Sequence, residues 1–388
     1  MRSAPIPSEQ AQAIVIALWR GDLDALADSW NALADAAHPG APFRSWAWLS
    51  SWWKTFSVGK ELAVLVAHRQ GHCVGLLPLF ATPSPLGGRR LALLGEGIVG
   101  SDYLGLVCAA ADEPELAAAF ADHLAHASFD ELDLDGLLPD DPLLTALASG
   151  LDGERSAQSP RYLCPHIQLR GDFESYLKAL PEGTGQQWKR RLRWLEKRPG
   201  FAIETLTSPA DLERGLQTLI ALHHRRWAVE GGSDAIDSPD VEAFHRRAGR
   251  ALAEAGWARL YLLNVEGETR AALYGFRHGD RFAFYQAGYD PDWRQRSVGT
   301  VLLGHVVQRC FAEGVAEYDF LRGSEPYKLK WANGERRTMR LRARDGSLRA
   351  QLHDRGRTLY WRLREAGKRA LPAETLAWAR RTRARVFR

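Results

Sequence analysis

The sequence predicts a mixed α/β protein made of two similar halves, and three observations carry that prediction. Hydrophobic periods of two and of 3.6 residues alternate along the chain, as expected where strands and helices alternate. The same order of elements, which is hairpin, strand, loop, helix and strand, occurs twice. The halves are also alike in residues, since 75–80 resembles 271–276 and 130–135 resembles 316–321. A tandem duplication explains the last two observations together.

In the first half, the turn residues 69–72 separate two apolar runs, which predicts a hairpin. The remaining period-two and period-3.6 stretches predict three strands and one helix. The expected elements are a hairpin of 62–68 and 73–80, strands at 90–94, 103–107 and 131–134, and a helix at 114–127.

The second half repeats this order after a basic amphipathic helix, 186–198, which Pro199 and Gly200 end. The expected elements are a hairpin of 258–265 and 269–276, strands at 281–287 and 317–321, and a helix at 300–313. Four regions follow: a first domain 1–170, a basic linker helix within 171–200, a second domain 201–345 and an arginine-rich tail 346–388. Helical segments are expected at 359–366 and 373–384 of the tail.

The composition is that of an ordinary globular protein, with 45% hydrophobic and 25% charged residues among 388. The four cysteines are far apart and have no metal-ligand spacing, so they predict free, buried thiols in a reducing compartment and no metal site. No secretory signal or membrane-spanning stretch is apparent. We expect a cytoplasmic protein. Four tryptophans between positions 46 and 53 have helical spacing, which favours a core role over sugar stacking.

Positive charge is concentrated at the end of the chain. Residues 336–388 hold 17 Lys and Arg against 4 Asp and Glu, whereas the rest of the chain is acidic overall. This asymmetry predicts either docking of the basic segment onto the body or contact with an anionic partner. An anionic membrane surface beside a synthase complex is one such partner.

The loop 289–300 is the strongest local signal for function. It leaves a strand and runs directly into a helix with an apolar stripe. The first turn of a helix exposes unpaired N–H groups and a partial positive charge, which suit an anion. Gly299 permits close approach to the backbone, and Arg294 and Arg296 offer charge-assisted hydrogen bonds. An ordinary helix start would also produce this pattern.

Arg296-x-x-Gly299 resembles the pyrophosphate loop Q/R-x-x-G-x-G/A of GNAT-superfamily acetyltransferases, although residue 301 is Val where that motif has Gly or Ala. The segments 222–227, 289–299 and 318–328 together are more specific. They resemble the branch of that superfamily related to Fem-type transferases and to the acyltransferases found with cellulose and exopolysaccharide synthesis genes. The resemblance covers roughly residues 40–335.

This resemblance implies two tandem GNAT-like domains, each a mixed, mostly antiparallel sheet flanked by helices, followed by a basic helical tail. It also implies that the second domain binds acetyl-CoA or another acyl-CoA as cosubstrate, whereas the first domain is degenerate and binds the acceptor. The loop 95–103 of the first half is rich in glycine but joins two strands. The implied cosubstrate-binding residues are Arg294, Arg296, Ser297, Val298, Gly299 and Thr300.

Acyl transfer needs a route for the acceptor's proton, a stabilised oxyanion and protonation of the leaving thiolate. By resemblance, Lys328 is the candidate for stabilising the carbonyl oxygen. Tyr327 is the candidate proton donor to the thiolate, and Glu325 or Asp319 the candidate acceptor of the proton. The structural alternatives are that Asp319 satisfies backbone donors at a strand end and that Tyr327 packs in the core.

The residues expected to bind the acceptor come from both halves. They are Asp102, Tyr103, His223, Arg226, Trp227, Tyr285 and Tyr289. For His223, Arg226 and Trp227, a purely structural role in the domain interface is the alternative.

Three functions remain open at this stage. The first is transfer of an acetyl or other acyl group from CoA to an amino or hydroxyl group of a sugar or polysaccharide precursor. The second is Fem-type aminoacyl transfer from tRNA, in which the helix 186–198 and the tail would contact phosphates. The third is a non-catalytic partner of a polysaccharide synthase. Val301 and the lack of an obvious His/Asp base favour that third function.

Overall fold

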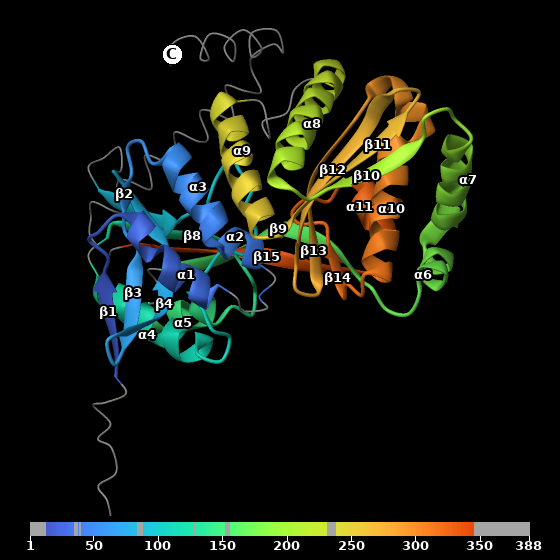
Figure 1. Cartoon of the computed structure of the whole chain (residues 1–388). Coiled ribbons are helices and arrows are strands. Elements are labelled where there is room, and N and C mark those ends of the chain that lie inside the picture. Colours follow the sequence, from blue (N-terminus) through green and yellow to red (C-terminus); the bar gives the residue numbers. More distant parts are fainter. Residues whose placement is uncertain are drawn as a thin grey trace, which may run out of the picture.

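The computed structural model of the chain describes residues 13–344 except 35–37, Pro39, 84–87, Ser128, 152–155 and 231–237. For Glu182 and residues 226–230 it describes the backbone alone. The two halves lie side by side, the first at the left of Figure 1 and the second at the right. Among the described residues, no helix has both the length and the apolar character needed to cross a membrane.

The first half combines short strands with helices packed on them. Its strands are β1 (Ile14–Leu18), β2 (Glu61–Leu62), β3 (Leu65–Arg69), β4 (His72–Leu77), β5 (Leu79–Pro83), β6 (Arg89–Leu93), β7 (Val107–Cys108) and β8 (Glu131–Leu137). Its helices are η2 (Leu23–Leu26), α1 (Ala27–Leu33), α2 (Ala41–Arg44), α3 (Trp46–Phe56), α4 (Glu113–His126) and α5 (Pro142–Gly150).

The second half contains the longer helices. Its strands are β10 (Ala202–Leu206), β11 (Ala258–Val265), β12 (Glu268–His278), β13 (Arg281–Tyr289) and β14 (Glu317–Asp319). Its helices are α6 (Phe173–Ala179), η3 (Pro181–Gly183), α7 (Thr184–Glu196), α8 (Pro209–Glu230), α9 (Pro239–Glu254), η4 (Pro291–Arg296), α10 (Val298–Ala312) and α11 (Pro326–Trp331). Two further strands, β9 (Ser156–Gln168) and β15 (Gly334–Arg344), connect the halves.

Both halves have antiparallel strands followed by a crossover to a parallel strand, as the repeat in the sequence predicted, but the first half is divided between two sheets, because β1, β3, β4 and β7 form a separate sheet of four strands. In the second half, β10, β11, β12 and β13 pair antiparallel in that order, and β14 then adds parallel to β13. In the first half, β1, β3 and β4 pair antiparallel, β5 pairs with β6, and β8 adds parallel to β6. The crossover before each parallel strand contains one α-helix, α4 or α10. The mixed α/β fold with helices flanking the sheets is therefore confirmed.

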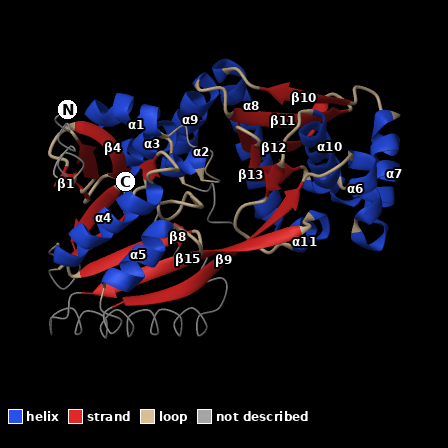
Figure 2. Ribbon diagram, turned by 90° about the horizontal axis from the view of Figure 1, so that it is seen from below, coloured by secondary structure: helices blue, strands red, loops and turns tan. Residues whose placement is uncertain are grey.

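The halves exchange their last strands. β9 follows the first half but pairs with β14 of the second, whereas β15 follows the second half and pairs with β8 of the first. β9 and β15 also pair with each other along most of their length. Figure 2 shows these two strands running from one half to the other. The result is one sheet of 11 strands, in the order β10-β11-β12-β13-β14-β9-β15-β8-β6-β5-β2.

An aromatic cluster joins the halves above this sheet. The Trp48 ring on α3 packs edge-on against Phe244 of α9, with the ring centroids 4.7 Å apart, and against Tyr285 of β13 at 5.4 Å. Trp48 and Trp52 are both buried, so the predicted core role of the tryptophan-rich segment is confirmed for these two. Cys108, Cys164 and Cys310 are buried and Cys73 is half-buried, and all four are free thiols.

The strand predicted at 103–107 is wrong, because only Val107 and Cys108 pair as β7. Tyr103 has a φ of 58° and Gly105 a φ of 156°, which breaks the extended conformation. The buried Arg44 guanidinium takes the place of a partner strand: its Nε donates to the Tyr103 carbonyl at 2.7 Å and its Nη1 to the Leu106 carbonyl at 2.9 Å. A single arginine therefore satisfies carbonyl groups that a sheet would otherwise pair.

The basic segment that begins at residue 336 starts inside the sheet. Arg336 on β15 forms ion pairs with Glu317 and Arg340 with Asp133, both of which are buried carboxylates. Residues 336–344 are thus part of the sheet, and Arg336 and Arg340 pair with acidic residues of the body. The predicted tail 346–388, with its two helical segments, lies outside the described residues.

Candidate functional site

A cavity of about 490 Å³ opens where β13 and β14 diverge. Their parallel pairing joins Arg281–Ala283 to Glu317–Asp319 and then ends, whereas β13 continues to Tyr289. The other edge of β13 pairs with β12, so residues 284–289 leave one backbone edge toward the diverging strand. The lining residues are His223, Leu273, Phe284, Tyr285, Gln286, Ala287, Gly288, Tyr289, Arg294, Ser297, Val298, Gly299, Thr300, Leu303, Glu325, Tyr327 and Lys328.

A β-bulge at Tyr285 shapes the cavity wall. Tyr274 of β12 is opposite Gln286 and Gly275 is opposite Phe284, so Tyr285 is the extra residue. Its hydroxyl donates to the Val99 carbonyl in the first half and lies 3.3 Å from Nε2 of the buried His245. Burial raises the pKa of Tyr285 well above that of free tyrosine. In the structure Tyr285 links the two halves, and its predicted role in acceptor binding stays a prediction.

The start of α10 forms a second wall. Ser297 has the left-handed conformation, with a φ of 55°, and ends η4 where α10 begins. The first-turn N–H groups of Val298, Gly299 and Thr300 have no acceptor one turn earlier in α10. A Cβ added to Gly299 would lie 3.6 Å from the Tyr289 ring, an ordinary contact, so the protein itself does not require glycine here. The missing side chain therefore leaves room for a ligand at the helix end.

Val301 does not obstruct this helix end, because its side chain is fully buried in the core of the second half. Its carbonyl accepts a hydrogen bond from Trp188 Nε1 of α7 at 3.1 Å. Gly304, one turn further on, gives the Trp188 indole the space it occupies, since an added Cβ would approach that ring to 2.2 Å. α7 is thereby docked closely on α10.

Asp290 anchors the loop that precedes α10. Its carboxylate is completely buried and accepts hydrogen bonds from Arg270 of β12 at 2.7 Å and from Arg225 of α8 at 3.0 Å. One oxygen also accepts from the N–H of Asp292. These contacts tie η4 to a strand and a helix of the second half, so the position of the helix end does not depend on a ligand.

The two arginines of the predicted cosubstrate loop have different positions. Arg294 lines the cavity. Arg296 does not, and its guanidinium lies over the Trp194 ring of α7, 4.3 Å from the ring centroid. Sequence reasoning placed both arginines on one ligand, and the structure separates them.

α11 brings the predicted catalytic residues to the cavity. Lys328 is 5% exposed, and its Nζ donates to the Arg322 carbonyl at 2.7 Å and lies 3.1 Å from a Glu325 carboxylate oxygen. An ammonium group has three donors, so one N–H remains beyond these two contacts. Gly323 has a φ of 119°, and a Cβ there would meet Glu325 at 2.3 Å and Lys328 Nζ at 2.9 Å. Tyr327 is 39% exposed, so the alternative of core packing is wrong.

Asp319, the other candidate proton acceptor, does not line the cavity. It is buried between the halves, where it accepts hydrogen bonds from the Tyr103 hydroxyl at 2.8 Å and from the Leu321 N–H at 2.7 Å. Burial raises the pKa of Asp319 to about 6, although the Arg336 guanidinium opposes that shift. This geometry favours the structural alternative, in which Asp319 satisfies a backbone donor at a strand end.

Asp102 and Tyr103, predicted to bind the acceptor, also lie outside the cavity lining. Asp102 is completely buried and accepts hydrogen bonds from the backbone N–H of Arg322 at 2.9 Å and from its Nε at 2.7 Å. Burial raises the pKa of the Asp102 carboxyl, and the Arg322 guanidinium opposes that shift. Since the Arg322 carbonyl accepts from Lys328, the first half holds the loop that positions Lys328.

His223 of α8 is buried and lines the cavity. Tyr289, at the end of β13, also lines it. The side chains of Arg226 and Trp227 lie outside the described residues, so their acceptor role stays a prediction. Several lining residues were not predicted, among them Leu273, Phe284, Gln286 and Leu303. They come from β12, β13 and α10, which only the tertiary fold brings around one cavity.

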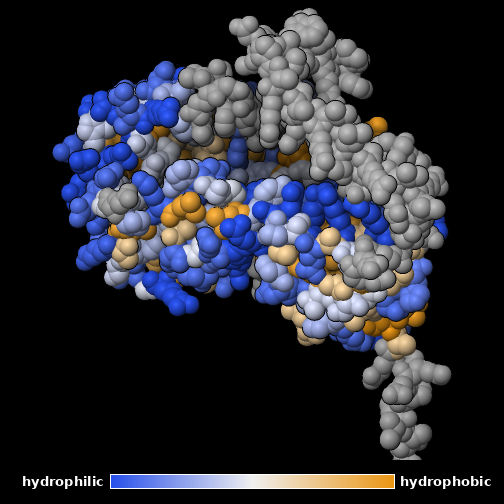
Figure 3. All heavy atoms as spheres, turned by 180° about the vertical axis from the view of Figure 1, so that it is seen from behind, coloured by the Kyte–Doolittle hydropathy of each residue, from blue (hydrophilic) through white to orange (hydrophobic). Residues whose placement is uncertain are grey.

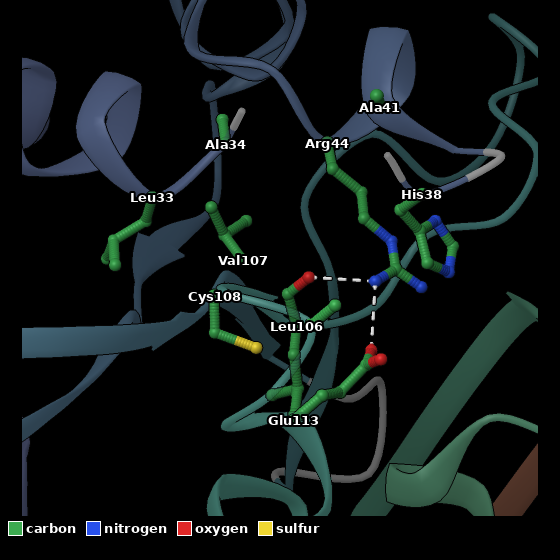
Figure 4. Close-up of a pocket in the computed structure, with 10 residues that line it drawn as sticks. Leu33, Ala34, His38, Ala41, Arg44, Leu106, Val107, Cys108 and Glu113 are labelled. Carbon is green, nitrogen blue, oxygen red and sulfur yellow. Dashed lines mark hydrogen bonds and ion pairs between the residues drawn. The ribbon is translucent and has the colours of Figure 1, made fainter. Parts of the chain in front are cut away.

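The first half has a smaller cavity beside its crossover helix. It measures about 190 Å³ and lies between the end of α1, α2, β7 and the start of α4. Figure 4 shows the Arg44 guanidinium bonded to the Leu106 carbonyl and to the Glu113 carboxylate in this cavity. Glu113 and Glu115 stand in the first turn of α4. Burial, with a smaller contribution from Arg44, keeps the pKa of the nearby His38 well below its ordinary value.

No metal site was expected, and within the described ranges no three His, Cys, Asp or Glu side chains form a group that could hold a metal ion. The candidate site is thus a cavity lined by the N-terminus of α10, the buried Lys328 and the open edge of β13.

Part of the chain matches a known protein family. Residues 184–329 match the model of the family described as "Acetyltransferase (GNAT) domain". This region contains α7 to α10 and the first four residues of α11, and it includes every residue that lines the candidate cavity. No curated protein matches the chain in sequence.

Solved structures share the fold at low sequence identity. The crystal structure of FemX has a TM-score of 0.59 at 12% identity, covering 81% of this chain and 95% of that one. A conserved protein of unknown function from Bacteroides thetaiotaomicron has a TM-score of 0.52 at 15% identity, covering 85% and 100%. The C-terminal domain of an Agrobacterium fabrum protein assigned as a lysylphosphatidylglycerol synthetase has a TM-score of 0.51 at 12% identity, covering 84% and 93%. These similarities establish the fold.

Proposed function

We propose that the protein is an acyltransferase that moves an acetyl or other acyl group from acyl-CoA to an amino or hydroxyl group. The observation that carries this proposal is the cavity between the open edge of β13 and the N-terminus of α10, with Lys328 at its other side. The match of residues 184–329 to a GNAT domain family supports the reaction class.

The cavity suits each part of an acyl-CoA donor. A pyrophosphate would accept hydrogen bonds from the N–H groups of Val298, Gly299 and Thr300, and Arg294 adds a positive charge nearby. The amide-containing arm of CoA would lie along residues 284–289, whose backbone edge can pair as an added strand does. The acyl group would then point toward α11.

The residues of α11 supply the chemistry. The acceptor attacks the thioester carbon, so that a C–N or C–O bond forms and the C–S bond breaks. Lys328 would stabilise the oxyanion with its remaining N–H. Glu325 would accept the proton of the acceptor, and Tyr327 would donate one to the departing thiolate. Glu325 is preferred over Asp319 because it lines the cavity and Asp319 does not.

The acceptor is proposed from the sequence alone. An amino sugar or hydroxyl of a polysaccharide precursor follows from the resemblance described above. Of the predicted acceptor residues, His223, Tyr285 and Tyr289 line the cavity and are the first to test. A panel of amino sugars, polyols and amines, assayed by release of free CoA thiol, would define the acceptor class.

Calorimetric titration with acetyl-CoA tests the donor. We expect micromolar binding that weakens at least tenfold in Arg294→Glu, because the substitution places a negative charge beside the phosphates. Arg214→Glu on the exposed surface of α8 is the matched control and should bind like the wild type. An absence of acetyl-CoA binding, with salt-sensitive binding of tRNA, would replace acyl-CoA by aminoacyl-tRNA as the donor. Binding of neither would favour the non-catalytic partner.

A further inference from the structure

The outward side of α7 carries a row of basic side chains. Arg190, Arg193 and Lys197 are all exposed and are spaced by three and four residues, so they are neighbours along one face of the helix. Trp188 and Leu195 are buried in the core of the second half. Since a helix has about 3.6 residues per turn, these two residues and the basic row lie on opposite faces of α7.

The basic row has no acidic partner in the part of the chain that the structure describes. Residues 186–198 hold six Lys and Arg against one acidic residue, Glu196, which forms no ion pair with the row. Lys189, on the flank of the same helix, does have a partner, because its ammonium group pairs with Glu174 of α6. The positive charge of the row is therefore not neutralised by the described protein.

Exposed arginines on the other long helices of the second half differ from the row. Each of α8, α9 and α10 places an acidic residue three or four positions from an exposed arginine and forms an ion pair with it. These pairs, all with a nitrogen–oxygen distance of 3.0 Å, are Arg214–Asp211, Arg250–Glu254 and Arg309–Glu313. An exposed row without such partners attracts an anion from outside the protein.

The position of α7 limits what that anion can be. The helix lies at the outer edge of the second half, beyond α10 (Figure 1), and this edge is strongly hydrophilic, as the left edge of the view from behind shows (Figure 3). No member of the row lines the candidate cavity. A straight row on the outward side of a helix can meet a flat surface with all its charges at once. A bilayer with anionic headgroups is a surface of this kind.

A single-stranded nucleic acid fits this edge less well. Proteins hold such strands partly by stacking the bases on aromatic rings. Trp194 is half-buried on α7, and the guanidinium carbons of Arg198 and Arg296 lie 3.9 and 4.3 Å from its ring centroid. Both guanidinium groups occupy positions over the ring that a stacked base would need. They add positive charge to the edge without offering a stacking surface.

We propose that the basic row of α7 docks the protein on an anionic lipid surface. The phosphates of the headgroups supply the negative charge that the described protein does not place beside the row. The attraction depends on charge and not on one fixed geometry, so lysine and arginine serve equally in it. The inference does not rest on the proposed acyltransferase function, because the row lies outside the candidate cavity.

Cosedimentation of the full chain with phospholipid vesicles tests this proposal. The wild type should bind vesicles of equal parts phosphatidylserine and phosphatidylcholine, less strongly as the salt concentration rises, and should not bind vesicles of phosphatidylcholine alone. Replacing the row by Arg190→Gln, Arg193→Gln and Lys197→Gln together should lower the partition coefficient roughly a hundredfold, since each basic residue near the surface contributes about fivefold. Glutamine has nearly the helix propensity of arginine and lysine, so α7 should stay folded, and circular dichroism checks this.

A matched control removes the same charge from another face. Arg214→Gln, Arg246→Gln and Arg250→Gln together change exposed residues of α8 and α9, and this variant should bind vesicles like the wild type. The charge-conserving variant Arg190→Lys with Arg193→Lys should also bind like the wild type. Equal losses in the two glutamine variants would assign the binding to net charge and overturn the inference.

Three further results would contradict the proposal. The first is a wild type that does not bind the anionic vesicles, and the second is unchanged binding when the row is replaced by glutamine. The third is binding of tRNA that depends on the row, without binding of vesicles, because it would assign the row to RNA. The glutamine variant of the row should keep the acetyl-CoA affinity of the wild type. A lower affinity would assign the row to the cosubstrate site and would also overturn the inference.

Discussion

The crossover helices α4 and α10 occupy the same place in the duplicated plan, yet their N-termini are opposite in charge. α10 has no acidic residue in its first turn and follows Arg294 and Arg296, whereas α4 begins with Glu113 and Glu115. A carboxylate at a helix N-terminus satisfies the partial positive charge that would otherwise attract a ligand anion. The comparison shows that both copies place a helix N-terminus at this point of the plan, while the sequence decides its charge and therefore whether it suits an anion.

In the first half, the N-terminus of α4 takes part in contacts that stabilise the fold. Arg44 bridges Glu113, Asp141 and the carbonyl groups of the 103–106 segment, where a ligand would have to enter. The first half contributes to the candidate site indirectly. Asp102 accepts a hydrogen bond from Arg322, and the Arg322 carbonyl accepts one from Lys328. The second half thus lines the cavity, and the first half positions the loop that bonds to Lys328.

The largest expected effect comes from placing a bulky side chain at the N-terminus of α10. Gly299→Trp should abolish acetyl-CoA binding, with a loss of at least a hundredfold, because the indole would occupy the space beside three first-turn N–H groups. Ala110→Trp, at the corresponding end of the first half, should leave the affinity unchanged. Calorimetry measures both, and equal losses in the two variants would contradict the assignment of one functional copy.

Removing the link between the halves should destabilise the protein. Asp102→Ala leaves the Arg322 guanidinium and N–H without their acceptor, and the loss of one partner of a buried pair costs roughly 3–5 kcal/mol. Asp135→Ala removes the more exposed pair with Arg161 and should cost about 1 kcal/mol or less. Urea unfolding measures both. Similar costs would mean that the interface is not held at Asp102.

Lys328→Ala separates binding from chemistry. We expect turnover to fall roughly a hundredfold to a thousandfold, the usual effect of losing one oxyanion donor, while the affinity for acetyl-CoA stays near that of the wild type. Steady-state rates with an acceptor from the panel, together with calorimetry, measure the two effects. Lys330→Ala, on the same helix and outside the cavity lining, is the control. Unchanged turnover in Lys328→Ala would remove Lys328 from the reaction.

The smallest expected effect is a pH dependence of stability from Asp319. Its pKa of about 6 lies above the unfolded value near 4, so the folded state binds the proton more tightly. Stability from this group is present below pH 4 and is lost as the pH rises through 6, by roughly 2–3 kcal/mol. Relative to Asp319→Asn, the wild type should therefore lose that amount of unfolding free energy between pH 4 and 7. A constant difference would refute the raised pKa.

The sequence predicted the elements whose signals are local. β11 was predicted with its observed bounds because a turn and an apolar run define it, and α10 was predicted to within two residues at its start. The exchange of β9 and β15 escaped prediction because it depends on pairing between residues that are far apart in the chain. Pro160 and Pro165 within β9 also weaken its strand pattern.

The candidate site was predictable in part for the same reason. The loop before α10 and the segment 325–328 carry local patterns, and both line one cavity. The positions of Arg296 on Trp194 and of Asp102 on Arg322 follow from tertiary packing, so the sequence did not reveal that both side chains lie outside the cavity lining. Arg322 was not predicted as a functional residue, because its partner Asp102 lies in the other half of the chain.

Hydrogen exchange with and without acetyl-CoA tests the central claim most directly, since it compares both copies in one experiment. We predict slower exchange in residues 284–289 and 298–303 and at 325–328, where the open strand edge, the helix end and α11 surround the cavity. Residues 107–116 of the first half should exchange at the same rate in both conditions. Protection of 107–116, or the absence of any protection at 284–303, would contradict the account.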